Sequence, residues 1–374
     1  MKTGQAVSLI TTHLHRNISG DVMDALRAAG LERFYLYAAR SVVIEREKRR
    51  FPPWGRNDLA NDPVDTLFFL INPEREADLV KLIIETGQLY TPGRGSALVE
   101  DVTLAGGHAL CGENEIPPPD VKASAMHIHP LTGICCILKR GQGDSVARIP
   151  LDTGTCVPVL HFGTGTGVRD KMGLLRITIP AEKEIIHAFA SPQEVDNLME
   201  AFIEIGRLDQ PGSGFIYTYP VKKGLVNIRV SRAEQRRAAS FEQIITALDH
   251  IKGGTEWRQR KNVVERKKGR GKRIIKNLVD LVLLCNGGTG TDLVKAAMFA
   301  GAGGATVSTA KMIRPAESPF AAISPIRECC SMIIPEATVE TVVEALEKAG
   351  AFTDRCHGQI FLRQASKAFT YWGK

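Results

Sequence analysis

The chain has 374 residues, of which 44% are hydrophobic and 24% charged, an ordinary composition for a globular protein of two to four domains. It begins without the apolar stretch of a signal peptide, and no apolar run approaches the ~20 residues that cross a bilayer, so we expect a cytoplasmic protein without membrane insertion. The net charge of +7 comes from one segment, because residues 258–276 contain ten Lys or Arg residues and a single acidic residue. Such a block is typical of a solvated linker, so we expect nucleic-acid binding to be weak at most.

The first predicted elements follow the order strand, helix, strand, strand, helix, strand. They are strands at residues 7–10, 34–44, 66–71 and 97–99, with helices at 19–29 and 73–87. The second helix has apolar residues at helical spacing (Leu79, Leu82 and Ile83), a Pro in its first turn and a Gly at its end. Pro lacks only an N–H that would be unpaired there, and Gly can take the left-handed conformation that closes a helix.

The same order recurs twice downstream. The second set has strands at 134–138, 157–162, within 175–189 and at 215–219, with helices at 144–151 and 192–206; the third has strands at 279–284, 305–313, 329–334 and 359–362, with helices at 292–300 and 335–350. A Pro, a Gly and a second Gly eight residues later punctuate each set: Pro73, Gly87 and Gly95; Pro192, Gly206 and Gly214; Pro335, Gly350 and Gly358. Three matches at nearly constant offsets indicate an internal repeat.

This order is that of a ferredoxin-like α+β fold, a four-stranded antiparallel sheet with both helices on one face. Three such sheets could cover each other, so the sequence predicts a βαββαβ unit repeated three times in an intramolecular pseudo-trimer. The predicted boundaries are residues 1–104, 131–230 and 278–374 for the three repeats, with a linker at 105–130 and a helical and basic linker at 231–277.

The stretch from Ile205 to Ile216 resembles the helix end, phosphate-binding B-loop and following strand of the P-II nitrogen-regulatory and P-II-like signal proteins. The resemblance implies an adenine nucleotide, ATP or ADP, in clefts between the repeats, since glycine-rich backbone amides can converge on an anion. The residues that it nominates are Gly93, Arg94 and Gly95, then Gly212, Ser213 and Gly214, and finally His357 and Gly358. The family's basic residue after the last loop glycine is replaced by Ser96, Phe215 and Gln359, and neither the modified tyrosine nor the 2-oxoglutarate glutamine of the T-loop is evident.

Two further glycine- and threonine-rich runs attract attention. Gly163, Thr164 and Gly165 follow His161 in a run that matches neither a Walker A loop nor a dinucleotide fingerprint. We interpret the run either as a flexible hairpin or as an anion or nucleotide contact. In the second run, at the start of the predicted helix 292–300, a threonine at 289 or 291 is expected to cap the helix.

Other polar features have simpler interpretations. His13 and His15, like His127 and His129, share a strand face, but a metal needs three or four ligands and nothing nearby completes either pair. We therefore predict no metal site. The excursion Arg46–Trp54 mixes arginines, prolines and a tryptophan, a composition that is typical of a contact surface. We interpret it either as a solvated loop or as a docking segment for a protein partner.

The function expected from the sequence is that of a P-II-like regulatory sensor. It would bind a small anionic metabolite between its repeats and signal to a protein partner through T-loop-like loops, as a monomeric pseudo-trimer or a dimer of such chains. No motif supplies a nucleophile and a base, so we predict no catalytic residues. The alternatives are an enzyme that acts on a phosphorylated substrate through its Gly-Thr-rich loops, a CutA-like module that binds divalent metals, and an RNA or DNA adaptor that uses the basic block.

Overall fold

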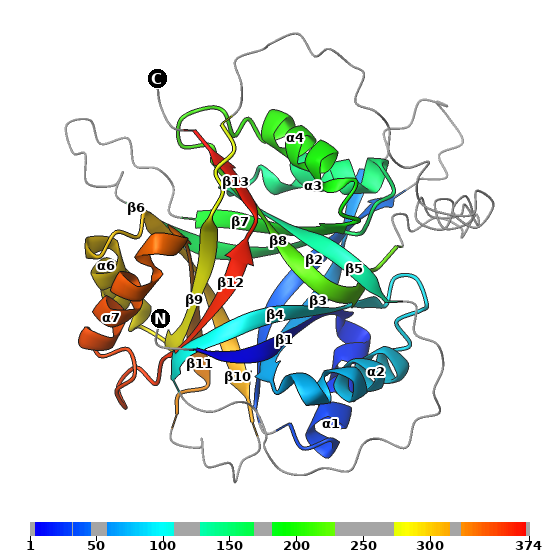
Figure 1. Ribbon diagram of the computed structural model, residues 1–374. Helices are drawn as coiled ribbons and strands as arrows, with labels where there is room; N and C mark the ends of the chain where they lie inside the picture. Colours follow the sequence, from blue (N-terminus) through cyan, green and yellow to red (C-terminus); the bar gives the residue numbers. More distant parts are fainter. Residues whose placement is uncertain are drawn as a thin grey trace, which may run out of the picture.

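The computed structural model describes residues 4–31, 33–45, 58–107, 128–167, 182–228, 273–314 and 323–371, which form thirteen strands and six α-helices (Figure 1). The strands are β1 (Gln5–His15), β2 (Phe34–Glu45), β3 (Asp58–Ile71), β4 (Gly95–Gly107), β5 (His129–Lys139), β6 (Val159–Gly167), β7 (Glu182–Ala190), β8 (Gly214–Leu225), β9 (Leu278–Asn286), β10 (Gly304–Ile313), β11 (Ile326–Pro335), β12 (Gln359–Ala365) and β13 (Lys367–Thr370). The helices are α1 (Arg16–Ala28), α2 (Glu76–Gly87), α3 (Gly143–Asp152), α4 (Val195–Ile205), α6 (Gly290–Phe299) and α7 (Val339–Lys348), with short 3-10 turns η1 (Pro73–Arg75) and η4 (Glu336–Thr338).

All thirteen strands belong to one antiparallel sheet, in the order β10-β11-β9-β12-β4-β1-β3-β2-β6-β7-β5-β8-β13. The sheet also turns back on itself, because β10 pairs with both β2 and β6, and β4 pairs with β8. The prediction of three ferredoxin-like repeats arranged as a pseudo-trimer is therefore wrong at the level of fold class.

The error has a physical cause. The order of helices and strands along the chain is the expected one, but a strand at the edge of a four-stranded sheet leaves its N–H and C=O groups unpaired. In this protein such edge strands pair with a strand of another predicted repeat: β12 pairs with β4, and β2 pairs with β6. The period-two pattern of a strand shows which side chains are buried, and it does not show which neighbour the backbone pairs with. The predicted domain boundaries stay a prediction.

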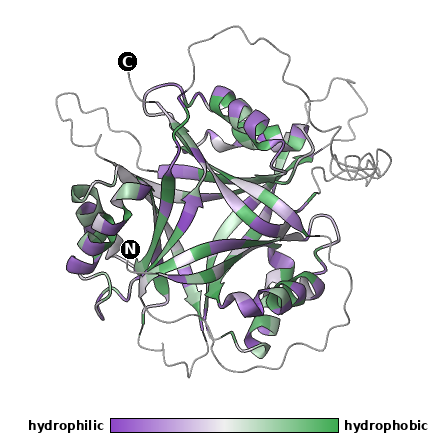
Figure 2. Ribbon diagram, in the orientation of Figure 1, coloured by the Kyte–Doolittle hydropathy of each residue, from purple (hydrophilic) through white to green (hydrophobic). Residues whose placement is uncertain are grey.

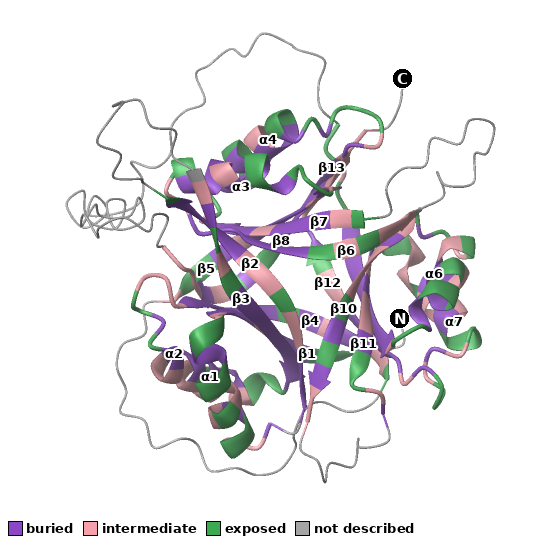
Figure 3. Ribbon diagram, turned by 180° about the vertical axis from the view of Figure 1, so that it is seen from behind, coloured by how far each residue is buried: buried purple, intermediate pink, exposed green. Residues whose placement is uncertain are grey.

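The helices lie in three pairs on the outside of the sheet: α1 with α2, α3 with α4, and α6 with α7 (Figure 1). Each pair covers a separate hydrophobic cluster, and two further clusters fill the inner side between the strands. Figure 2 shows hydrophobic and hydrophilic residues alternating around the helices, and Figure 3 shows that their outward faces are exposed while most strands are buried. The strands therefore surround an interior on which side chains from all parts of the chain converge.

The second helix of each set ends in a left-handed residue, as predicted, but not always at the predicted glycine. Gly350 has a φ of 85°, whereas the residues after Gly87 and Gly206 take that conformation instead, with φ of 48° for Gln88 and 50° for Arg207. The predicted helix ends are thus confirmed to within two residues, since α2 ends at Gly87, α4 at Ile205 and α7 at Lys348.

Several predictions fall on residues outside the described ranges. They include the proposed partner-docking segment Arg46–Trp54, all but the last four residues of the basic block 258–276, and most of the two linkers. Among the helices that the structure does describe, none combines the length and the apolar character needed to cross a membrane.

Candidate functional site

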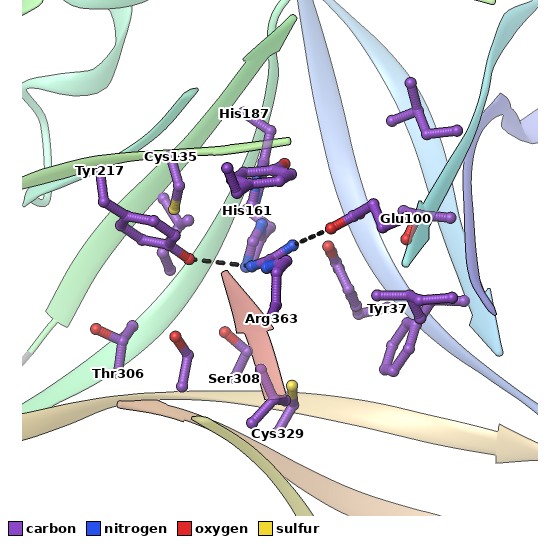
Figure 4. A pocket seen from close by; sticks show the side chains of 18 of the residues that line it. Tyr37, Glu100, Cys135, His161, His187, Tyr217, Thr306, Ser308, Cys329 and Arg363 are labelled. Atoms are coloured by element: carbon purple, nitrogen blue, oxygen red, sulfur yellow. Dashed lines mark hydrogen bonds and ion pairs between the residues drawn. The ribbon is translucent and has the colours of Figure 1, made fainter. Parts of the chain in front are cut away.

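The interior of the sheet contains a cavity of about 110 Å³, which we call the central chamber (Figure 4). Strands β1 to β12 all contribute to its wall. Its polar and aromatic lining residues include Thr11, His13, Tyr37, Glu100, Cys135, His161, His187, Tyr217, Tyr219, Thr306, Ser308, Cys329, Ser331 and Arg363. For comparison, an apolar cavity of ~150 Å³ binds benzene, and a single water needs ~10–15 Å³. The chamber is therefore large enough for several waters or for one small molecule.

Strand alternation places these side chains, since successive residues point to opposite faces of a sheet. On β7, Glu184 points outward and accepts hydrogen bonds from the backbone N–H of Gly143 (2.6 Å) at the start of α3, while its neighbour Ile185 lines the chamber. On β11, Glu328 accepts in the same way from Gly290 N (2.7 Å) at the start of α6. Glu184 and Glu328 thus attach β7 and β11 to the helices outside the sheet. The residue that follows each acid, Ile185 or Cys329, lines the chamber.

Arg363 of β12 lies at the centre of a buried polar network (Figure 4). Its guanidinium donates to Glu100 Oε2 (2.9 Å), to Asp280 Oδ2 (2.5 Å) and to the hydroxyl of Tyr217 (3.1 Å). It also lies 4.0 Å from the ring centroid of Tyr219, a cation–π distance. Asp280 is fully buried and Glu100 is 2% exposed. One cation therefore joins two buried carboxyl groups from β4 and β9.

Burial also shifts the acid–base properties of Glu100. Its pKa is raised, because the cost of burying the charged form exceeds the attraction of Arg363. An arginine side chain stays protonated in proteins, so Arg363 keeps its positive charge, while Glu100 takes up a proton at a higher pH than an exposed glutamate would.

Three histidines form a second group in the chamber. The rings of His161 and His187 stack with centroids 5.3 Å apart, and His13 lies 6.3 Å from His187. Burial lowers the pKa of His13 to about 4 and that of His161 to about 3, and the pKa of His187 also falls well below its usual value. All three are therefore neutral near pH 7, and each neutral ring has one donor and one acceptor nitrogen.

The remaining titratable groups of the chamber are also held in their neutral forms. Burial raises the pKa of the Cys135 and Cys329 thiols to about 12. It likewise raises the pKa of Tyr37, Tyr217 and Tyr219 above the ordinary tyrosine value. A thiolate nucleophile is therefore absent from the described lining at neutral pH, since the thiolate is the reactive form of cysteine.

Three polar atoms of chamber residues have no hydrogen-bond partner within the described part of the chain. They are Arg363 Nε, His13 Nε2 and His161 Nδ1, and all three are buried. Buried polar groups are almost always paired with protein, water or a ligand. Across the described ranges no cluster of three His, Cys, Asp or Glu side chains is arranged to hold a metal ion.

One side of the chamber is closer to solvent than the rest. Strands β2, β6 and β10 pair with each other only in short stretches of two to four residues. Between those stretches lie Tyr37, His161 and Ser308, one on each strand, and all three line the chamber. Tyr37 and Ser308 are partly exposed. The backbone pairing around the chamber is therefore interrupted where these three strands separate.

The loops nominated as nucleotide-binding lie away from the chamber. At the first loop, Gly93 donates its N–H to Asn227 Oδ1 (2.9 Å), and Arg94 Nε donates to the carbonyl of Gly87 (2.6 Å). Gly93, Arg94 and Gly95 line a hollow of about 10 Å³, no larger than one water. Two polar groups of this loop are therefore engaged within the protein, and the nucleotide-binding role of its residues stays a prediction.

The other two loops are engaged in similar ways. Gly212 and Ser213 lead into β8, where the carbonyl of Gly214 accepts from the Thr370 hydroxyl (3.0 Å) because β13 pairs there. In the third loop, Gly358 donates its N–H to Ala351 O (2.7 Å), and the buried Arg327 donates to the carbonyl of His357 (2.5 Å). Each of the three loops thus forms hydrogen bonds within the protein, and the bonding partners differ from loop to loop.

The Gly-Thr-rich run is a strand rather than a loop. Gly163, Thr164 and Gly165 belong to β6, and residues 164–167 pair with β10. The predicted threonine cap of α6 is also incorrect, because Thr289 makes no side-chain capping bond and the helix start is held by Glu328. Seven cysteines are described, none of them is in a disulfide, and six are buried.

No family model matches this chain, and no curated protein matches it. Among solved structures, one match is described as "Crystal structure study of anthrone oxidase-like protein". It is 11% identical, the match covers 61% of this chain and 97% of that one, and the TM-score is 0.18. At that score the two folds are not alike, so this match carries no argument about function. The resemblance to P-II proteins stays a prediction.

Gly214 illustrates that the loop glycines are needed for the fold itself. It has a φ of 151°, and a Cβ there would lie 2.2 Å from the carbonyl oxygen of Ile137. We expect Gly214→Ala to lower the free energy of unfolding by at least ~2 kcal/mol, measured by urea denaturation. Gly20→Ala is the control, since Gly20 lies within α1 with open space around it, and it should stabilise by up to ~1 kcal/mol. Equal stabilities of the Gly214 variant and the parent would contradict this account.

Proposed function

We propose that this protein binds a small polar metabolite inside the central chamber and acts as a binding or sensor protein rather than as an acid–base catalyst. The observation that supports this most directly is that three side chains lining one cavity, those of Arg363, His13 and His161, each carry a buried nitrogen without a hydrogen-bond partner among the described residues. An occupant that completes their hydrogen bonds would remove a cost of about 1–3 kcal/mol for each unsatisfied group.

The chemistry of the lining favours binding over catalysis. A general acid or base works best when its pKa lies near the working pH. The pKa is about 4 for His13 and about 3 for His161, it is also lowered for His187, and the thiols of Cys135 and Cys329 have pKa values of about 12. These groups would hold a ligand through fixed neutral hydrogen bonds, and they would exchange protons with it only poorly at pH 7.

The size of the chamber restricts the ligand. A volume of about 110 Å³ suits a compound smaller than or similar to benzene, and an adenine nucleotide is far larger. ATP or ADP would therefore have to bind outside the chamber, at loops whose polar groups are largely engaged. The nucleotide, the T-loop signalling and the partner-docking role of Arg46–Trp54 stay predictions.

The test is a thermal-shift and calorimetric screen of small polar fragments at millimolar concentration, with ATP and ADP in parallel. We expect fragments of the size of a single small ring, or smaller, to stabilise the protein, by about 2.7 kcal/mol at a hundredfold excess over the dissociation constant. Ser308→Leu, which fills the chamber from β10, should abolish the effect. Thr309→Leu is the matched control, since the adjacent Thr309 is exposed.

Two results would overturn the proposal. One is stabilisation by ATP or ADP that Ser308→Leu leaves intact, together with no response to any small fragment. The other is fragment binding that is equally strong in the Ser308 and Thr309 variants, which would place the site elsewhere.

A further inference from the structure

The balance of charge in the chamber narrows the class of ligand. Arg363 is the one cationic side chain among the described lining residues, and it faces two carboxyl groups, Glu100 and Asp280. The three histidines carry no charge near neutral pH. The chamber therefore has no surplus of positive charge for an anion, and burying an uncompensated charge is expensive.

A cationic ligand is disfavoured by a different feature. The unpaired nitrogen of Arg363 is an N–H donor on a guanidinium, which requires an acceptor and repels positive charge. The unpaired nitrogens of His13 and His161 can each donate or accept, depending on the tautomer. A ligand that forms hydrogen bonds with all three nitrogens needs at least one strong acceptor atom. A donor group next to that acceptor would pair with a histidine nitrogen that accepts.

We propose that the chamber takes a neutral amide- or urea-type compound whose carbonyl oxygen accepts a hydrogen bond from the guanidinium group of Arg363. Such a group is planar, carries no charge and combines an acceptor with adjacent N–H donors. Aromatic side chains, among them Tyr37, Phe68 and Tyr219, provide flat surfaces along the wall. This inference rests on the proposed function, since it requires that the chamber is the binding site.

The test uses three ligands of nearly identical shape that differ in charge: acetamide, acetate and acetamidinium. Their dissociation constants are measured by ligand-observed NMR at pH 7.5 and millimolar concentration. We expect acetamide to bind the parent protein about tenfold more tightly than either ion, the ratio that corresponds to ~1.4 kcal/mol. Ser308→Leu should remove acetamide binding.

Glu100→Gln provides a second, independent arm. This change keeps an oxygen that can accept from Arg363 but removes one carboxyl group, so acetate should gain about tenfold relative to acetamide. Glu182→Gln is the control, because Glu182 forms an exposed ion pair with Arg140 outside the chamber, and it should change nothing. Asp280→Asn makes the same test from the other carboxyl group if Glu100→Gln does not fold.

The possible failures are distinguishable. Tighter binding of acetate or acetamidinium than of acetamide by the parent, lost in Ser308→Leu, would overturn the ligand class while leaving the chamber as the site. Binding of none of the three ligands by the parent or by Glu100→Gln would overturn the site together with the inference. Unchanged selectivity in Glu100→Gln would show that charge balance does not set the preference.

Discussion

Arg363→Met is expected to lower the free energy of unfolding by about 3–5 kcal/mol at pH 7.5, because it leaves Glu100 and Asp280 buried without their shared cation. The loss should be measured by urea denaturation, which also reports whether the transition keeps its slope. It should shrink as the pH falls, since protonation removes the unpaired negative charges.

A rescue variant and a surface control sharpen this prediction. Combining Arg363→Met with Glu100→Gln and Asp280→Asn should restore most of the stability, because no uncompensated charge then remains in the network. Lys367→Met breaks an ion pair with Asp196, whose side chain is 70% exposed, and should cost less than ~1 kcal/mol. A loss in Arg363→Met no larger than that of the control would show that the guanidinium does not hold the carboxyl groups together.

The second large effect is a loss of stability on mild acidification. In the unfolded chain the chamber histidines titrate near pH 6.5, whereas in the folded protein the pKa values of His13 and His161 are about 4 and 3, and that of His187 is also lowered. Below pH 6.5 the unfolded state therefore binds protons that the folded state does not. Stability falls as pH decreases toward the folded pKa values, by up to ~2 kcal/mol per histidine at pH 5.

Glu100 acts in the opposite direction. Because its folded pKa is raised, acidification toward that pKa favours the folded state and offsets part of the loss. We expect a net decrease between pH 7.5 and pH 5, measured as the free energy of unfolding in urea. His161→Phe should reduce the pH dependence by roughly one third, the share of one histidine in three. His129→Phe, at an exposed position, should leave it unchanged. A flat profile in the parent would contradict the neutral histidine cluster.

The local structure was largely predictable from the sequence. Helical spacing and punctuation by Pro and Gly placed all six described helices, including α3, whose pattern is weak. These signals are local, and the structure preserves them. The pairing of strand edges depends on partners far apart in the chain, and for that reason the single sheet was missed.

The chamber could not be predicted from the loop motifs, because its lining residues lie on strands. The same glycines that marked the loops carry the signal: Glu100, Tyr219 and Arg363 each lie five residues after Gly95, Gly214 and Gly358. Aligning the three strands on those glycines brings an acid, a tyrosine and an arginine to matching positions, on the strand face opposite to each glycine. His13 was seen in the sequence but was set aside as a chance polar position, since a metal was the only role considered for it.

The route by which the chamber is assembled has a consequence for synthesis on the ribosome. Glu100 and its cation Arg363 are 263 positions apart in the chain. A nascent chain that has already emerged with β1 to β4 therefore carries an acid facing the future interior with no counter-charge to meet it. Water can be excluded from that face only after β12 has been synthesised. We therefore expect the inner side of the first four strands to stay hydrated during translation. A chaperone that shields this surface would act before residue 363 leaves the exit tunnel, and would have no substrate afterwards.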